Sequence, residues 1–206
     1  MNKLFILFLL FPVMVCALEE KKYYAEYMGH LLWERSLKDR SINYEDILNG
    51  FNEASQKLPA KISDEEAMRI FFELEKQQFE ELAERNLQQS VAFLKEIASQ
   101  SGIMPIVEEK VYTKIVQEGS GEGLLAHESG LFKLKAYRPN ETPFYENNKG
   151  IMQALNVAIE GFGKGALGIK IGEKRIIYVH PEYAYGIYNP SHPNTIIIVE
   201  VERVAH

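Results

Sequence analysis

The sequence predicts an α+β protein in which an N-terminal all-helical arm with a long stalk helix precedes an antiparallel sheet wrapped on one short helix. Two observations lead to this class. From residue 20 to residue 101 apolar side chains recur every three or four positions, and glycine and proline are scarce. After Gly102 short apolar and aromatic runs with a period near two alternate with glycine and proline turns, as in strands. We therefore expect four segments, at residues 1–17, 18–62, 63–102 and 103–206.

Residues 1–17 have the pattern of a secretory signal peptide. Lys3 supplies a positive start, and Leu4 to Val15 form an almost unbroken apolar stretch that is too short to span a bilayer comfortably. Compact residues precede a cleavage point after Ala17, and the chain then turns polar. We expect an exported protein, periplasmic or secreted, with no transmembrane span in the mature chain.

Cys16, the only cysteine, lies inside this segment. Cleavage after Ala17 would leave a mature chain without a thiol or a disulfide. The alternative is a lipoprotein that is cleaved before Cys16, acylated there and anchored in the outer membrane, although Val15 is a poor match for such a site.

The formal net charge of -6 over 206 residues argues against a protein that tracks nucleic-acid phosphates. It also gives little attraction to anionic membranes. We expect the partners to be proteins or peptides, with no nucleic acid among them.

Residues 18–62 predict two helices. The first has one apolar face, and the second starts with Asn43 as N-cap, with Asp46 in its first turn and a hydrophobic staple between Ile42 and Ile47. The face of the first helix consists of Tyr23, Tyr24, Tyr27, Met28, Leu31 and Leu32. The second helix is expected to end near Pro59.

A capping box at Ser63 to Glu66 starts the third helix, and the next proline is Pro105. One helix can therefore run from Asp64 to about Ser101, a length of more than about 50 Å at 1.5 Å per residue. Two short helices cannot cover its apolar stripe. We expect self-association near its start, giving a homodimer through the N-terminal helices, or a stalk that separates two modules.

The C-terminal segment predicts strands at Glu109 to Val116, Gly130 to Tyr137, Lys174 to Val179 and Thr195 to Val204. Turns are expected at residues 119–123 and 140–143. A single short helix is expected at Val157 to Gly165.

Pro181-Glu182-Tyr183-Ala184-Tyr185-Gly186, placed between two predicted strands, resembles the signature of the FKBP-type prolyl isomerases. Ile159 to Phe162 are similar to the family's Ile-x-Gly-Trp helix, and Thr142 to Phe144 resemble the strand end that presents its pocket phenylalanine. The join from Gly102 through the Val111 to Val116 strand resembles that of Mip/FkpA-type bacterial proteins, which combine a signal peptide, helical dimerisation domain, stalk and isomerase domain.

This resemblance implies an isomerase that rotates X-Pro bonds of unfolded or proline-containing polypeptides and has chaperone activity. The barrier, about 18–20 kcal/mol, comes from amide resonance, so an apolar pocket with a few hydrogen-bond donors serves and no cofactor or metal is required. By family position the catalytic residues are Phe144, Ile159, Phe162 and Tyr185, and the substrate-binding residues are Leu134, Tyr145, Ile151, Ala158 and Ile198. For the apolar members ordinary core packing is the alternative, and for Tyr185 packing in a turn.

Four positions depart from the family pattern. Leu134 replaces a tyrosine, Tyr145 an aspartate, Phe162 a tryptophan and Ile198 a phenylalanine. They leave open a non-catalytic dimeric chaperone or peptide-binding protein with a degenerate pocket. A third hypothesis is a dimeric spacer.

Two other patterns do not support a site. Gly163 to Gly168 fit G-x-G-x-x-G, but no apolar strand leads into the motif and no helix follows, so nucleotide binding is not expected. The five histidines have no cysteine or carboxylate partners at metal-ligand spacing.

Overall fold

The computed structural model describes residues 21–34, 43–139 and 143–205. They fall into two units that divide between Lys76 and Gln77. The expected signal peptide with Cys16, the Ile42 half of the staple and residues 140–142 of the predicted turn lie outside the described residues. None of the helices in the described ranges is long and apolar enough to cross a membrane.

The first unit contains helices whose starts follow the predicted capping chemistry. Residues 21–34 are helical, and α2 spans Tyr44–Ser55 with the side-chain oxygen of Asn43 accepting the Glu45 amide at 2.8 Å. The Ser63 hydroxyl accepts the Glu66 amide at 3.2 Å, just before α3, Asp64–Ala98. The carboxylate of Glu66 is instead bound by Arg69, at 2.7 and 3.1 Å, so it does not complete the expected capping box.

Large apolar side chains remain exposed on all three helices of this first unit. None of the residues of α2 is buried. The exposed apolar residues of the unit include Tyr23, Tyr24, Tyr27, Met28, Leu48, Phe51, Met68, Phe71, Phe72 and Leu74. We call this set the apolar face of the first unit. Two of its members, Phe71 and Leu74, belong to the apolar stripe predicted for the long helix.

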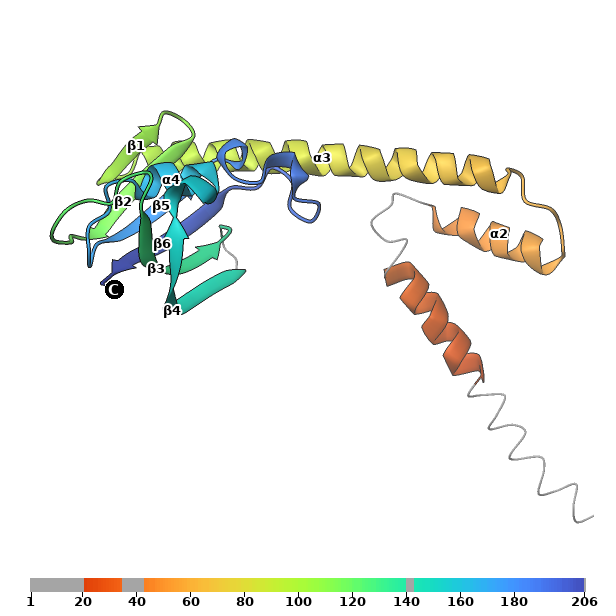
Figure 1. Ribbon diagram of the computed structural model, residues 1–206. Coiled ribbons are helices and arrows are strands. Elements are labelled where there is room, and N and C mark those ends of the chain that lie inside the picture. The colour runs from red at the N-terminus through yellow and green to blue at the C-terminus, as the bar shows by residue number, and fades with distance from the viewer. Residues whose placement is uncertain (1–20, 35–42, 140–142, 206) are drawn as a thin grey trace, which may run out of the picture. The chain divides into compact units, whose positions relative to one another are not determined.

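The second unit is built on a six-stranded sheet in the order β1-β2-β5-β6-β3-β4, and every neighbouring pair is antiparallel. This confirms the predicted fold class. The strands are β1 (Ile103–Val107), β2 (Val111–Gln117), β3 (Ser129–Tyr137), β4 (Tyr145–Ala154), β5 (Lys174–Val179) and β6 (Ile197–Val204) (Figure 1).

Neither edge strand was predicted, because the composition of each is unusual for a strand. β1 contains Pro105, which a sheet tolerates only at its edge or at a bulge. β4 carries a polar run, Glu146 to Gly150, and none of its residues is buried. The helix α4, Glu160–Ala166, begins three residues after the expected start because the 3₁₀ turn η2, Leu155–Val157, precedes it.

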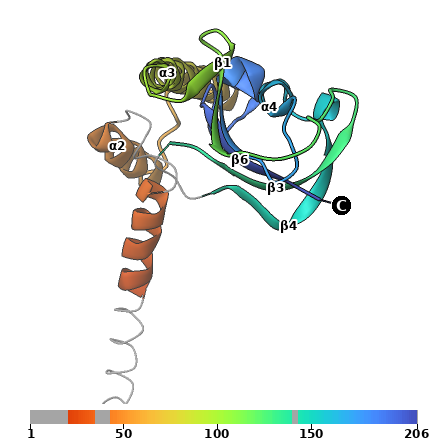
Figure 2. The same cartoon turned by 90° about the vertical axis from the view of Figure 1, so that its left-hand side faces the viewer.

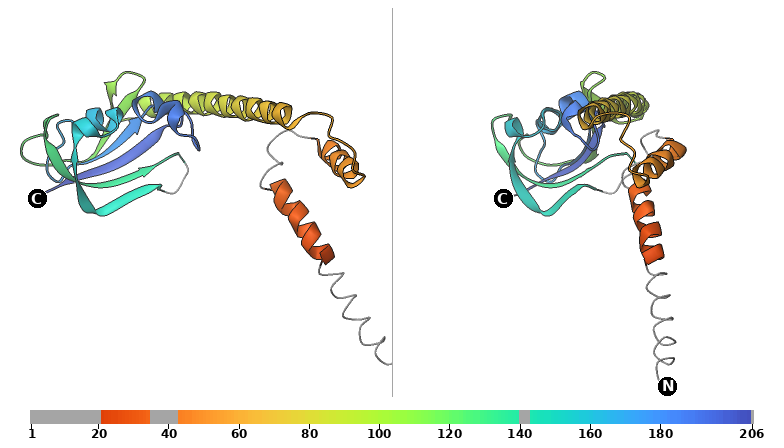
Figure 3. Two further views of the ribbon diagram at one scale, coloured as in Figure 1. Left: turned by 45° about the vertical axis from the view of Figure 1, so that its right-hand side comes forward. Right: turned by 90° about the vertical axis from the view of Figure 1, so that its right-hand side faces the viewer.

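The sheet curves around α4 (Figures 2 and 3). Its two faces carry different cores. Inside the curve, Phe162 and Ala166 of α4 pack with Ile177, Val179 and other inward residues of the central strands. On the opposite face, Leu94 and Ile97 from the end of α3 pack with Tyr112, Tyr178, Ile196 and Ile198. Strand alternation therefore decides whether a side chain faces α4 or α3.

Polar contacts anchor the second half of α3 to the segment before β6. The Ser90 hydroxyl, 2% exposed, donates to the Asn194 carbonyl at 3.1 Å and accepts the Ile196 amide at 2.9 Å. The side-chain amide of Asn86 donates to the Pro193 carbonyl at 2.9 Å. This part of α3 is thus an integral part of the second unit.

Two glycines bring α4 close to β5. A Cβ at Gly161 would lie 2.2 Å from the Val179 side chain, and one at Gly165 would lie 2.4 Å from the Ile177 side chain. Gly165 also belongs to the G-x-G-x-x-G pattern. Close helix-to-sheet packing accounts for that glycine without a nucleotide.

We expect Gly161→Ala to lower the free energy of unfolding by about 1–3 kcal/mol, because a methyl group would overpack the buried contact with Val179. The midpoint of urea denaturation measures the change. Lys164→Ala, at an exposed position of the same helix, is the control and should alter stability by less than about 0.5 kcal/mol. Equal stability of wild type and Gly161→Ala would contradict the packing argument.

Candidate functional site

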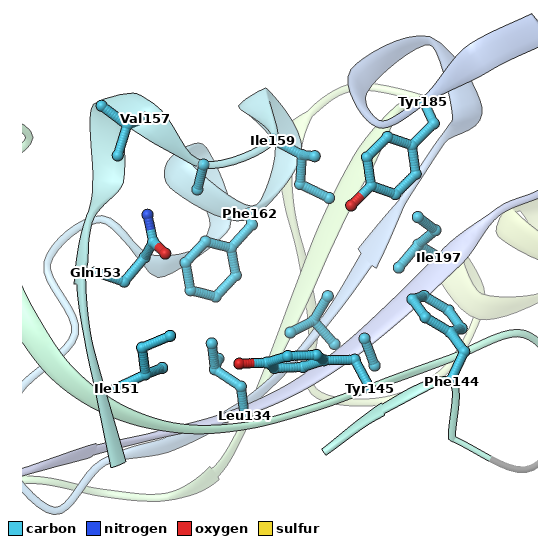
Figure 4. Close-up of a pocket in the computed structure, with 13 residues that line it drawn as sticks. Leu134, Phe144, Tyr145, Ile151, Gln153, Val157, Ile159, Phe162, Tyr185 and Ile197 are labelled. Carbon is cyan, nitrogen blue, oxygen red and sulfur yellow. The ribbon is translucent and has the colours of Figure 1, made fainter. Parts of the chain in front are cut away.

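A cavity of about 610 Å³ lies in the second unit between α4 and the curved sheet (Figure 4). Its walls come from β3, β4, β6, the η2–α4 segment and the turn that carries Tyr185. The lining residues are Leu134, Ala136, Phe144, Tyr145, Ile151, Gln153, Val157, Ala158, Ile159, Phe162, Tyr185, Ile197 and Val199.

Phe162 contributes the most deeply buried aromatic ring of this cavity. It is 4% exposed and meets Phe132 edge to face, with ring centroids 5.9 Å apart. Because Phe162 stands on α4, its position depends on how closely that helix packs against β5. The glycine contacts at Gly161 and Gly165 set this spacing.

A buried ion pair holds the end of α4. The guanidinium of Arg175 donates to the carbonyls of Gly165 and Leu167, each at 2.9 Å, and pairs with the carboxylate of Glu173. The other oxygen of Glu173 accepts the Lys170 amide at 2.9 Å. These bonds satisfy carbonyls at the helix terminus that have no partner within the helix. Sequence reasoning identified this segment only as a turn and a strand.

Tyr185 stands on one rim, with its hydroxyl pointing into the cavity (Figure 4). It follows the 3₁₀ turn η3, Pro181–Tyr183, and precedes another, η4, Gly186–Tyr188. The Tyr188 amide donates to the Tyr185 carbonyl at 3.2 Å. The side chain is 51% exposed, so the hydroxyl is accessible to a molecule entering the cavity.

Phe144 and Tyr145 form another part of the rim, where β4 begins. They are 43% and 41% exposed. The Phe144 amide donates to the Ala136 carbonyl at 3.0 Å, and the guanidinium of Arg138 lies over the Phe144 ring, 4.7 Å from its centroid. The backbone bond and the stacked cation both orient this ring.

Among the described residues, none that lines the cavity has a charged side chain. Its polar side-chain groups are the hydroxyls of Tyr145 and Tyr185 and the amide of Gln153, whose nitrogen donates to the Ala154 carbonyl at 3.1 Å. Among the described residues no group of three or more His, Cys, Asp or Glu side chains could hold a metal ion. The site therefore offers apolar walls and neutral hydrogen-bonding groups.

The structure brings all but one of the predicted site residues to this cavity. Those that line it are Leu134, Phe144, Tyr145, Ile151, Ala158, Ile159, Phe162 and Tyr185, and their individual roles stay predictions. Sequence reasoning missed Ala136, Gln153, Val157, Ile197 and Val199.

The prediction for Ile198 is corrected. Ile198 packs on the α3 side of the sheet, whereas its neighbours Ile197 and Val199 line the cavity. Successive residues of a strand point to opposite faces, so a shift of one residue reverses the face. The run from Ile196 to Val199 is uniformly apolar, so the sequence does not show which of its residues face the cavity. Glu200 is two residues beyond Ile198 and therefore lies on the same face of the strand as Ile198.

Two protein-family models match the chain. Residues 22–108 match the domain amino-terminal to FKBP-type peptidyl-prolyl isomerase. Residues 131–202 match FKBP-type peptidyl-prolyl cis-trans isomerase, a range that includes every residue lining the cavity.

Curated relatives match most of the chain. Peptidyl-prolyl cis-trans isomerase Mip of Chlamydia trachomatis is 30% identical over 198 residues, covering 91% of this chain and 79% of that protein. The Mip protein of Chlamydia pneumoniae is 30% identical over 181 residues, covering 85% and 70%.

Solved structures share the fold. FkpA from Escherichia coli matches with a TM-score of 0.72 at 20% identity, over 92% of this chain and 94% of that one. A peptidyl-prolyl cis-trans isomerase from Pseudomonas syringae matches with a TM-score of 0.56 at 17% identity, over 60% of this chain and 94% of that one.

We expect Arg175→Met to lower the free energy of unfolding by about 3–5 kcal/mol, because it leaves the buried carboxylate of Glu173 without its partner. The double variant Glu173→Gln/Arg175→Met, which removes both charges, should recover part of that loss, because the carbonyls of Gly165 and Leu167 still lack the guanidinium. Chemical denaturation monitored by circular dichroism measures both. Equal destabilisation of the single and double variants would contradict this account of the pair.

Proposed function

This chain belongs to the FKBP-type peptidyl-prolyl cis-trans isomerases of the Mip group, and we propose that the cavity beside α4 is where it rotates the X-Pro bond. The chain is a peptidyl-prolyl isomerase. One observation carries the assignment of the site: an apolar cavity with only uncharged polar groups lies within the range that matches the isomerase model.

Rotation of the bond needs a surface that favours the twisted amide over the planar one. The barrier of about 18–20 kcal/mol reflects lost resonance, and apolar walls remove the water that stabilises the planar, more polar form. In our proposal Phe162 contacts the proline ring, and Phe144, Ile151 and Leu134 form walls. The hydroxyl of Tyr185 donates to a carbonyl of the substrate.

The remaining lining residues hold the substrate backbone and the residue before proline. Ala158 and Ile159 form the rim next to α4, and Tyr145 adds a second hydroxyl. Ile197 takes the place that the sequence assigned to Ile198. None of these groups forms a covalent bond in the mechanism, and the site acts by binding the transition state more tightly than the ground state.

We also propose that the first unit joins two copies of the chain. Its apolar face is too exposed for an isolated unit in water, and a second copy would cover it. In a dimer two cavities would serve one unfolded polypeptide, which fits a chaperone as well as an isomerase. The predicted signal at residues 1–17 would export this dimer to the periplasm or beyond, with a lipid on Cys16 as the alternative.

We expect Tyr185→Phe to reduce kcat/KM in a proline-limited refolding reaction by about fivefold, because one hydrogen bond of about 1 kcal/mol is lost in the transition state. The uncatalysed reaction takes tens of seconds, which makes the acceleration easy to follow. Tyr188→Phe is the control, since Tyr188 is 92% exposed and does not line the cavity.

If Tyr185→Phe and Tyr188→Phe changed kcat/KM equally, the proposed role of Tyr185 in the site would be contradicted. A mature protein that suppresses aggregation of an unfolded client without accelerating refolding would favour the non-catalytic chaperone.

We expect light scattering of residues 18–206 at high micromolar concentration to give the mass of a dimer. Phe72→Glu should reduce it to a monomer, because Phe72 is 61% exposed and a charge there would be buried in the interface. Val91→Glu, at an exposed apolar position of the same helix in the second unit, is the control and should stay dimeric. A monomeric wild type would contradict the proposed assembly.

A further inference from the structure

His180 is a buried histidine at the start of the turn that carries Tyr185. Its ring is almost enclosed, and Nδ1 accepts the Glu182 amide at 3.1 Å as the N-cap of η3. Its own amide donates to the Lys110 carbonyl at 2.8 Å, and its carbonyl accepts the Tyr183 amide at 2.9 Å. An accepting Nδ1 has no proton, so the ring in this arrangement is neutral, with its proton on Nε2.

The bond to Nδ1 is one of several contacts that hold this turn, together with backbone hydrogen bonds and the Lys110–Glu182 ion pair. η3 is three residues long, and its backbone bonds run from Tyr183 to His180 and from Ala184 to Pro181, each at 2.9 Å. Tyr185 lies two residues beyond the end of η3, and its hydroxyl enters the cavity. The residue that caps η3 and the group that we assign to the substrate carbonyl therefore belong to one short segment.

We propose that His180 is a positioning residue that makes the isomerase activity depend on pH. With a neutral ring the turn is capped and the Tyr185 hydroxyl faces the cavity. A proton on Nδ1 turns the acceptor into a donor that opposes the Glu182 amide, and the turn then releases Tyr185. This inference rests on the proposed role of Tyr185 at the cavity.

The charges around the ring favour its neutral form. Lys110 and Glu182 form an ion pair at 2.6 Å, with the Glu182 carboxylate 3.9 Å from Nδ1. Burial lowers the pKa of His180, Lys110 lowers it further, and Glu182 opposes them. The other titratable groups that line the space beside the ring are Lys95 of α3, Glu108 and Glu109 of the β1–β2 turn and Tyr112 of β2.

The sign of the effect follows from the lowered pKa. The unfolded or released segment takes up a proton near the ordinary histidine pKa of about 6.5, whereas the capped turn does so only at lower pH. The capped state is therefore fully favoured above that pH and loses its advantage as the pH falls. His180 and Pro181 are buried and Tyr183 and Ala184 contact the core, but the other residues as far as Tyr188 are exposed or half-buried. Opening this segment therefore exposes less apolar surface than unfolding the sheet.

The test compares the full mature chain with His180→Asn and His180→Leu between pH 7.5 and 5.0. Exchange NMR on a proline peptide without titratable side chains reports kcat/KM at each pH. The wild type should lose about fivefold, the factor by which loss of a helix cap typically shifts an equilibrium. In His180→Asn the asparagine side chain can accept the Glu182 amide but does not titrate, so this variant should stay active with the same kcat/KM at every pH. His180→Leu has no acceptor, so its kcat/KM should be lowered equally at every pH.

Two further measurements separate positioning from general stability. In the Tyr185→Phe background the pH dependence assigned to His180 should largely disappear, and near-UV circular dichroism should show a folded protein at pH 5.0. An active wild type with a flat profile would overturn the role of His180 and leave the proposed site intact. A wild type without activity at any pH would count against the proposed site instead.

The ring NMR signals of Tyr185 test the inference without activity. They should shift with pH in the wild type and stay constant in His180→Asn. Tyr185 ring signals that do not change with pH in either protein would overturn the inference.

Discussion

The close contact between α4 and β5 is the constraint on which the site depends. Gly161 and Gly165 remove the side chains that would otherwise separate the helix from Val179 and Ile177, and Arg175 binds the carbonyls at the end of the helix. This contact places Phe162 in the lining of the cavity. A helix held at the distance of an ordinary side-chain layer would place the ring elsewhere, and the curved sheet would enclose a different space.

The lack of charge in the cavity is consistent with the chemistry assigned to it. A planar amide and a twisted amide are both neutral, so a fixed charge is not needed to distinguish them, whereas removal of water changes their relative free energies. The charged groups of the second unit are used elsewhere. Glu173 and Arg175 hold α4, and Lys110 and Glu182 flank His180 next to the turn of Tyr185. Charge therefore supports the position of the walls without entering the cavity.

The two units present apolar surface in different ways. In the second unit both faces of the central strands are covered, one by α4 and one by the end of α3. In the first unit the tyrosines of residues 21–34 and the phenylalanines of α3 remain exposed. A unit with a covered core and a unit with exposed apolar side chains agree with the proposed division into catalysis and association.

Local patterns in the sequence determined the helices, the central strands and the residue types of the site. Caps at Asn43 and Ser63, a three-to-four period and strand alternation depend on neighbours along the chain, and they placed α2, α3, β3 and β5 close to their observed bounds. The signature at Pro181 to Gly186, with the matching upstream segments, located most residues that line the cavity.

Tertiary structure decided what depends on contacts between distant segments. The edge strands β1 and β4 form because a neighbouring strand supplies their hydrogen bonds, although Pro105 and the polar run of β4 give them little strand character of their own. The uniform apolar run before Glu200 concealed which of Ile197 and Ile198 faces α4. The arrangement of His180, Lys110 and Glu182 joins segments 72 residues apart, and a sequence pattern read over short windows carries no information about such a contact.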